Sequence, residues 1–143
     1  MRFMMLMIPR GYEPATLATA PDAKKMAAMR AYTESLQKAG ILLAVDGLHP
    51  PSMGARVTFP GGKAVVKDGP FSEAKEVIGG YWMIQVKSRE EAIAWASRCP
   101  GGEDETIEIR QVHEMADCLA DVPAAAGSFT QQQANASARN AAR

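Results

Sequence analysis

The stretch with the strongest chemical character is Asp68-Gly69-Pro70-Phe71. Asp accepts hydrogen bonds from nearby amides, Gly permits a positive φ, and Pro disfavours a helical conformation at the residue before it. We therefore expect a sharp turn that holds the Asp68 carboxylate in one direction. Two interpretations stay open: an Asx turn that only satisfies backbone donors, which is the commoner case, or a general base in a cleft.

Two further side chains could act beside Asp68. His49 could pair with it or bind a substrate, although a lone histidine in a loop before two prolines is more often simply exposed. Tyr81 could orient a ligand through its hydroxyl, although most such aromatic residues belong to the core. We predict catalytic roles for Asp68 and His49, and a ligand-binding role for Tyr81.

Three charged residues complete the candidate set. Arg110 could bind a carboxylate or a phosphate through both arms of its guanidinium group. Alternatively, Arg110 could form an ion pair with Glu108 or Glu76 across a dimer interface. We predict ligand-binding roles for Arg110, Glu108 and Glu76.

Composition argues against several functional classes. The 16 Lys and Arg residues balance the 16 Asp and Glu residues, so no nucleic-acid surface and no membrane-binding surface is expected. The apolar run at residues 3–8 is too short to span a bilayer and lacks a signal-peptide cleavage pattern, so we predict a cytoplasmic protein. Cys99 and Cys118 fit no zinc or redox spacing, and with only two histidines we expect no metal and no cofactor.

The elements that would position these residues alternate between strands and helices. The first strand is continuously apolar from Phe3, which predicts burial on both of its faces. The segment 72–77 fits either a short helical turn or a bulge. The predicted elements are a strand at 1–8, a helix at 21–39, a strand at 41–45, a peripheral hairpin at 56–59 and 64–67, a strand at 81–87, a helix at 88–99 and a strand at 106–112.

Both predicted helices carry an apolar stripe and recognisable ends. Asp22 suits the start of the first helix and Gly40 its end, while Ser88 and Glu91 have the spacing of a capping box. The predicted buried residues of the first helix are Met26, Met29, Tyr32 or Thr33, and Leu36. Those of the second helix are Ala92, Ile93, Trp95 and Ala96.

This order of elements is a split β-α-β arrangement with an inserted hairpin, which is the ferredoxin-like α+β plan. Both helices would cover one face of a four-stranded antiparallel sheet and leave the other face bare. Because that bare face would carry apolar residues of strand 1 together with Tyr81 and Met83, we expect a homodimer in which two sheets pack face to face. Its cleft would be bordered by Gln85, Glu108 and Arg110. We assign residues 1–117 to this domain and 118–143 to a flexible or weakly helical Ala- and Gln-rich tail.

The chain resembles the YCII-related, or DGPF-domain, family of small bacterial proteins over about residues 1–115. The resemblance is carried by Gly47-Leu48-His49-Pro50, Asp68-Gly69-Pro70-Phe71 with Glu73, Lys75 and Glu76, Gly79-Gly80-Tyr81, Glu91-Ala92-Ile93 with Trp95-Ala96, and Ile107-Glu108-Ile109-Arg110. It implies a dimeric α/β barrel, a His-Asp site for which His49 and Asp68 are the candidates, and an association with extracytoplasmic-function sigma factors. The family has no established activity. Gln111 departs from the pattern, since the family usually has Pro there.

Three functions follow as hypotheses. The first is a cytoplasmic dimer that binds or senses a small molecule, because no complete catalytic constellation is present. The second is a cofactor-independent enzyme in which Asp68 is the base and His49 or Arg110 assists. The third is an interaction module that contacts a sigma factor.

Overall fold

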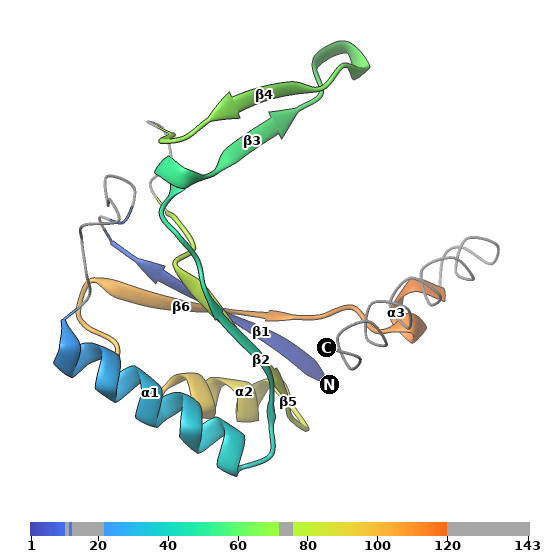
Figure 1. Ribbon diagram of the computed structural model, residues 1–143. Helices are drawn as coiled ribbons and strands as arrows, with labels where there is room; N and C mark the ends of the chain where they lie inside the picture. The colour runs from blue at the N-terminus through green and yellow to red at the C-terminus, as the bar shows by residue number, and fades with distance from the viewer. Residues whose placement is uncertain (11, 13–21, 72–75, 120–143) are drawn as a thin grey trace, which may run out of the picture. The chain divides into compact units, whose positions relative to one another are not determined.

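The computed structural model describes residues 1–10, 12, 22–71 and 76–119 as a mixed α+β protein (Figure 1). Four strands form one antiparallel sheet: β1 (Arg2–Pro9), β2 (Leu42–Gly47), β5 (Gly80–Gln85) and β6 (Glu105–Gln111). Strands β3 (Ala55–Thr58) and β4 (Val65–Asp68) form a second, two-stranded sheet. The α-helices of these residues are α1 (Ala23–Lys38), α2 (Arg89–Ala96) and α3 (Met115–Leu119), and single 3₁₀ turns occur at Pro51–Met53 and Pro60–Gly62.

The four-stranded sheet has the order β2-β5-β1-β6. β1 lies at its centre, where Met5 is opposite Trp82 of β5 on one side and Ile109 of β6 on the other. Helix α1 connects β1 to β2, and α2 connects β5 to β6, so each helix joins two strands that are not neighbours in the sheet. Figure 1 shows α1 and α2 lying side by side along the sheet.

The hydrophobic core lies between these two helices and one face of the sheet. Fully or almost fully buried side chains come from the strands (Phe3, Met5, Met7, Trp82, Ile84), from Val86 directly after β5, and from the helices (Tyr32, Leu36, Ala92). Along β1, buried residues alternate with half-buried residues. The expectation that β1 is buried on both faces is therefore wrong for the single chain, since the helices cover one face only.

The helix ends follow from local sequence. Gly40 adopts a φ of 71° after α1 and donates its amide to the Gln37 carbonyl at 2.9 Å, which is the expected end at a left-handed glycine. The Ser88 hydroxyl accepts a hydrogen bond from the Glu91 amide at 3.1 Å. The Glu91 carboxylate in turn accepts from the Lys87 amide at 2.8 Å, one residue earlier than in a standard capping box.

Two residues predicted to be buried are exposed instead. Met26 of α1 is 49% exposed, because it borders an open hollow near Val45 and Gly47. Ile93 of α2 is 37% exposed. Successive helical residues point about 100° apart, so Ile93 cannot share the inward direction of the fully buried Ala92.

The β3–β4 hairpin matches the predicted peripheral ribbon, with each strand displaced by one residue. Val57 is opposite Val66, and all eight strand residues are exposed. Gly61 and Gly62 have φ values of 60° and 81° in the connecting turn, which a residue with a side chain rarely adopts.

Two predicted segments fall wholly or partly outside the residues that the structure describes. Residues 72–75 of the predicted turn and residues 120–143 of the predicted tail lie outside the described residues. The second compact unit of the chain begins at Val112 and contains α3. Within the ranges that the structure describes, no helix is long and apolar enough to cross a membrane.

Candidate functional site

The Asp68-Gly69-Pro70-Phe71 corner packs closely against the loop that follows β2. The Gly69 amide donates a hydrogen bond to the Gly54 carbonyl at 2.9 Å. A Cβ atom at Gly69 would lie 1.7 Å from the Pro51 carbonyl oxygen, far closer than any real contact. Position 69 therefore requires glycine because two backbone segments meet there. The Phe71 side chain is buried, which fixes the corner from the inside.

The loop that receives this corner is tied to the sheet by hydrogen bonds at its start. The Leu48 amide donates to the Gly79 carbonyl at 2.9 Å, and the Tyr12 hydroxyl donates to the Leu48 carbonyl at 2.6 Å. Pro50 is buried. The corner and the loop thus form a defined wall beside the start of β5.

An open hollow of about 430 Å³ lies between this wall and the base of the hairpin. Its ionisable lining residues are His49, Arg56 and Glu76. Its apolar lining includes Leu48, Met53, Phe71 and Ile78. The volume falls in the range of small-molecule sites, which are mostly apolar with a few polar groups that orient the ligand.

Arg56 is the best positioned of the ionisable groups. Its guanidinium carbon lies 4.0 Å from the centre of the Phe71 ring, so the ring holds the cation by a cation–π contact. No carboxylate of a described residue forms an ion pair with Arg56. Its N–H groups are therefore available to an acidic group of a ligand, which a guanidinium group can bind in bidentate geometry.

The predicted pair of Asp68 and His49 is divided between two places. His49 lines the hollow, whereas Asp68 ends β4 opposite Ala55, is exposed, and does not line the hollow. Among the described residues, no hydrogen bond or ion pair involves either side chain. The catalytic roles of Asp68 and His49 remain predictions.

Three of the other predicted residues, Tyr81, Glu108 and Arg110, lie on the sheet face that carries no helix. The Tyr81 hydroxyl donates a hydrogen bond to Asp46 Oδ2 at 2.7 Å. This hydrogen bond is the main reason that the pKa of Tyr81 is raised, with smaller contributions from burial and from the Asp46 charge. Arg110 pairs with Glu108 of the same strand at 3.2 Å. The open face thus carries two polar pairs, and Glu76 belongs to the hollow instead.

Between these pairs lies an apolar patch of the open face. Leu6 is opposite Tyr81 on one side and Glu108 on the other, and Met4 is opposite Met83 and Arg110. Met4, Leu6 and Met83 are half-buried. We call these three residues the open-face patch.

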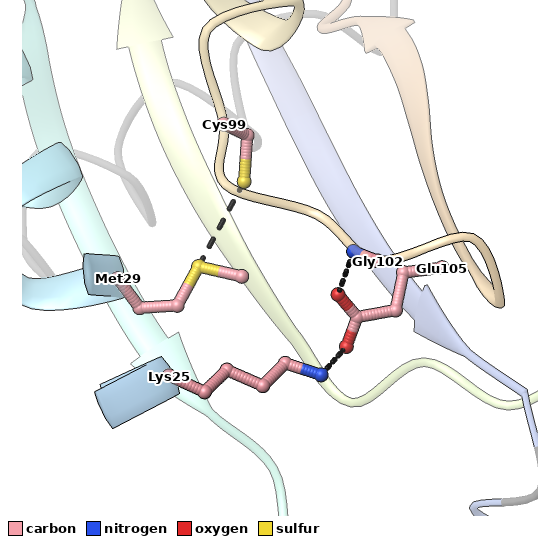
Figure 2. A network of polar contacts seen from close by, with 5 residues as sticks. All are labelled: Lys25, Met29, Cys99, Gly102 and Glu105. Carbon is pink, nitrogen blue, oxygen red and sulfur yellow. Dashed lines mark hydrogen bonds and ion pairs between the residues drawn. The ribbon is translucent and has the colours of Figure 1, made fainter. Parts of the chain in front are cut away.

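A third polar cluster joins α1 to β6 on the helix side of the sheet. Figure 2 shows Glu105 between the ammonium group of Lys25 and the amide of Gly102, which donates at 2.9 Å. Burial disfavours the ionised form of Glu105, but the hydrogen bonds from Lys25 and Gly102, with the Lys25 charge, outweigh it and lower the pKa. Burial, helped by the Glu105 charge, raises the pKa of the Cys99 thiol to about 11. Cys99 is therefore protonated at neutral pH and is no reactive thiolate.

Comparison with known proteins identifies the family of this chain. The profile of the YCII-related domain matches residues 1–116. The chain belongs to the YCII-related family. The resemblance inferred from the sequence is thereby confirmed.

A curated relative of this YCII-related protein is an uncharacterized protein of Rhizobium meliloti (strain 1021). The two sequences are 33% identical over 75 residues, which are 52% of this chain and 60% of the relative. The chain thus spans about 60% of the length of that relative.

Sequence reasoning missed two important residues of this YCII-related domain. In the sequence analysis, Arg56 was placed in the hairpin and given no role. Because Arg56 directly precedes Val57 in a strand, its side chain lies on the opposite face of the hairpin from Val57. That alternation was the available signal. Asp46 gave no signal, because its contact with Tyr81 joins strands 35 residues apart. Among the described residues, no group of three His, Cys, Asp or Glu side chains could hold a metal ion.

Proposed function

We propose that this YCII-related protein is a homodimer that binds a small organic anion in the hollow beside the Asp68-Gly69-Pro70-Phe71 corner. The observation that carries the proposal is the Arg56 guanidinium held over the Phe71 ring at the edge of that hollow. The family match supports the fold but supplies no activity.

The lining favours a ligand with an acidic group and an apolar body. Arg presents a planar, always charged fork of N–H donors that matches a carboxylate or a phosphate. His49 adds a second polar group beside it, and Leu48, Met53 and Ile78 offer an apolar wall. Glu76 at the same hollow disfavours a ligand that is anionic throughout. A small carboxylic acid with a hydrocarbon or aromatic part meets these conditions.

The proposed assembly is a ferredoxin-like domain that pairs through its open sheet face, as in a dimeric α/β barrel. The strand order β2-β5-β1-β6 with helices on one side supports this fold. The open-face patch supports the pairing, because packing against a second copy would remove apolar surface from water. The polar pairs Tyr81–Asp46 and Arg110–Glu108 would then border the contact. Sedimentation equilibrium that reports a stable monomer would contradict the dimer.

Calorimetric titration tests the ligand site. The probes are acetate, butyrate, benzoate and phenylacetate, with inorganic phosphate as an anion that has no apolar part. We expect binding to strengthen with apolar size, and Arg56→Gln to weaken it roughly 10- to 100-fold, since a hydrogen bond to a charged group is worth about 1.5–3 kcal/mol.

Arg98→Gln is the matched control for this titration. Its guanidinium carbon lies 4.4 Å from the Trp95 ring centre, so it makes the same kind of contact away from the hollow. Binding that is absent for every probe, or that both variants weaken equally, would refute the proposed site.

A further inference from the structure

Two positive charges stand side by side at the base of the β3–β4 hairpin. Arg56 of β3 is directly opposite Lys67 of β4, and both residues are exposed. Directly opposite residues of an antiparallel pair point to the same side, with their Cβ atoms roughly 5 Å apart. Both charges therefore lie on one face of the hairpin, within reach of a single bound group.

This face of the hairpin adjoins the hollow. Arg56 lines the hollow, and its guanidinium group lies over Phe71, which lines the hollow as well. Lys67 directly precedes the Asp68-Gly69-Pro70-Phe71 corner and is not a lining residue. Its long and flexible side chain lets the ammonium group approach a head group that Arg56 holds.

No acidic side chain of the described residues neutralises this pair of cations. Asp68 follows Lys67 in β4, so its side chain lies on the opposite face of the hairpin, together with Val57 and Val66. Glu76 lines the hollow, and within the described ranges it forms an ion pair with neither cation. Like charges directly opposite each other destabilise a strand pair. An anion that binds both cations would remove this repulsion.

We infer that Arg56 and Lys67 act as a clamp for a head group with two negative charges, and that Lys67 sets the preference for dianions over monoanions. This inference rests on the proposed ligand site and specifies the class of its ligand. The fork of Arg56 binds two oxygen atoms of the head group, and Lys67 supplies a second charge beside it. The apolar body of the ligand then lies against Met53 and Ile78, so that only one end of the ligand is anionic.

Two kinds of head group carry two negative charges in so small a space. A phosphate monoester has three terminal oxygen atoms on one phosphorus atom and is a dianion above its second pKa of about 6. Two carboxylates on neighbouring carbon atoms supply the same charge in two planar groups. Either of them engages both cations, whereas a single carboxylate or a sulfate monoester leaves Lys67 without a partner charge.

Calorimetric titration with matched pairs of probes tests the clamp at about pH 8, where phosphate monoesters are dianions. Phenyl phosphate and phenyl sulfate have nearly the same shape and differ by one charge, and phthalate differs from benzoate by one carboxylate. We expect a dianion to bind about three- to tenfold more tightly than its monoanionic counterpart. The probe pair that shows this gain identifies the head group. Equal affinities within both pairs overturn the clamp.

Lys67→Gln tests which residue supplies the preference. We expect this variant to weaken the dianions to the affinity of their monoanionic counterparts. Lys63→Gln, in the turn at the other end of the hairpin, is the matched control and keeps the preference. Removing one of two facing like charges does not destabilise the hairpin, so unfolding cannot explain a lost preference. A preference that survives Lys67→Gln overturns the role of Lys67.

The same titrations separate the clamp from the ligand site itself. Benzoate binding that Arg56→Gln weakens, without any preference for dianions, refutes the clamp and leaves the ligand site in place. Absence of binding by every probe refutes the ligand site, and the clamp with it.

Discussion

Gly69→Ala is the substitution that most directly tests how the corner is built. An added Cβ would lie 1.7 Å from the Pro51 carbonyl oxygen and 2.6 Å from its carbonyl carbon. Both are backbone atoms, so no side chain can rotate away to relieve the overlap. Carbon and oxygen would need to separate to more than 3 Å, so that the two segments would move apart by well over 1 Å.

The energetic cost follows from two consequences of that movement. The Gly69 N–H to Gly54 carbonyl bond, at 2.9 Å, would stretch beyond the range of a hydrogen bond. Its loss costs about 1 kcal/mol, and inserting a methyl group into a packed contact costs about 1–3 kcal/mol more. We expect the free energy of unfolding to fall by about 2–4 kcal/mol, which corresponds to a melting temperature lower by on the order of 10 °C.

Urea and thermal denaturation followed by tryptophan fluorescence measure this loss, because Trp82 is buried and Trp95 packs against the core. Gly54→Ala is the matched control from the same loop. Its φ is −108°, and its added Cβ would lie at an ordinary 3.6 Å from the Pro51 oxygen. If Gly69→Ala is as stable as Gly54→Ala within about 0.5 kcal/mol, the close backbone approach is refuted.

Two further predictions concern the sheet. The pKa of Glu105 is lower in the folded state than its ordinary value of 4.5, so the unfolded state takes up the proton first as the pH falls. The ionised Glu105 therefore contributes stability above pH 4.5, and this contribution is lost as the pH falls through the folded-state pKa. The fall in unfolding free energy between about pH 5 and pH 3 should therefore be shallower in Lys25→Met than in Lys24→Met, and equal slopes would contradict the ion pair. Leu6→Lys should raise the dimer dissociation constant more than tenfold in sedimentation, with Glu34→Lys on the exposed side of α1 as the control; unchanged dissociation would exclude the open face from the interface.

The sequence by itself determined the elements and their ends. The glycine at position 40, the Ser88 cap and the alternation of β5 depend on residues within one or two turns of each other, so local rules predicted them. Tyr81 and Met83 lie on the open face, as their alternate positions predicted, whereas Trp82, Ile84 and Val86 point into the core. The Asp68-Gly69-Pro70-Phe71 signature and its neighbours were specific enough to indicate the family, which the profile match then confirmed.

Only the tertiary structure decided which residues meet. Strand order and register brought Asp46 to Tyr81, and the course of the chain through the corner brought Arg56 over Phe71 and Gly69 against Pro51. Those pairs are separated by 15 to 35 residues, and no local periodicity encodes such a separation. For the same reason the sequence around Asp68 could not predict which side chains line the hollow beside the corner. The hollow is lined by His49, Arg56 and Glu76, and Asp68 does not line it.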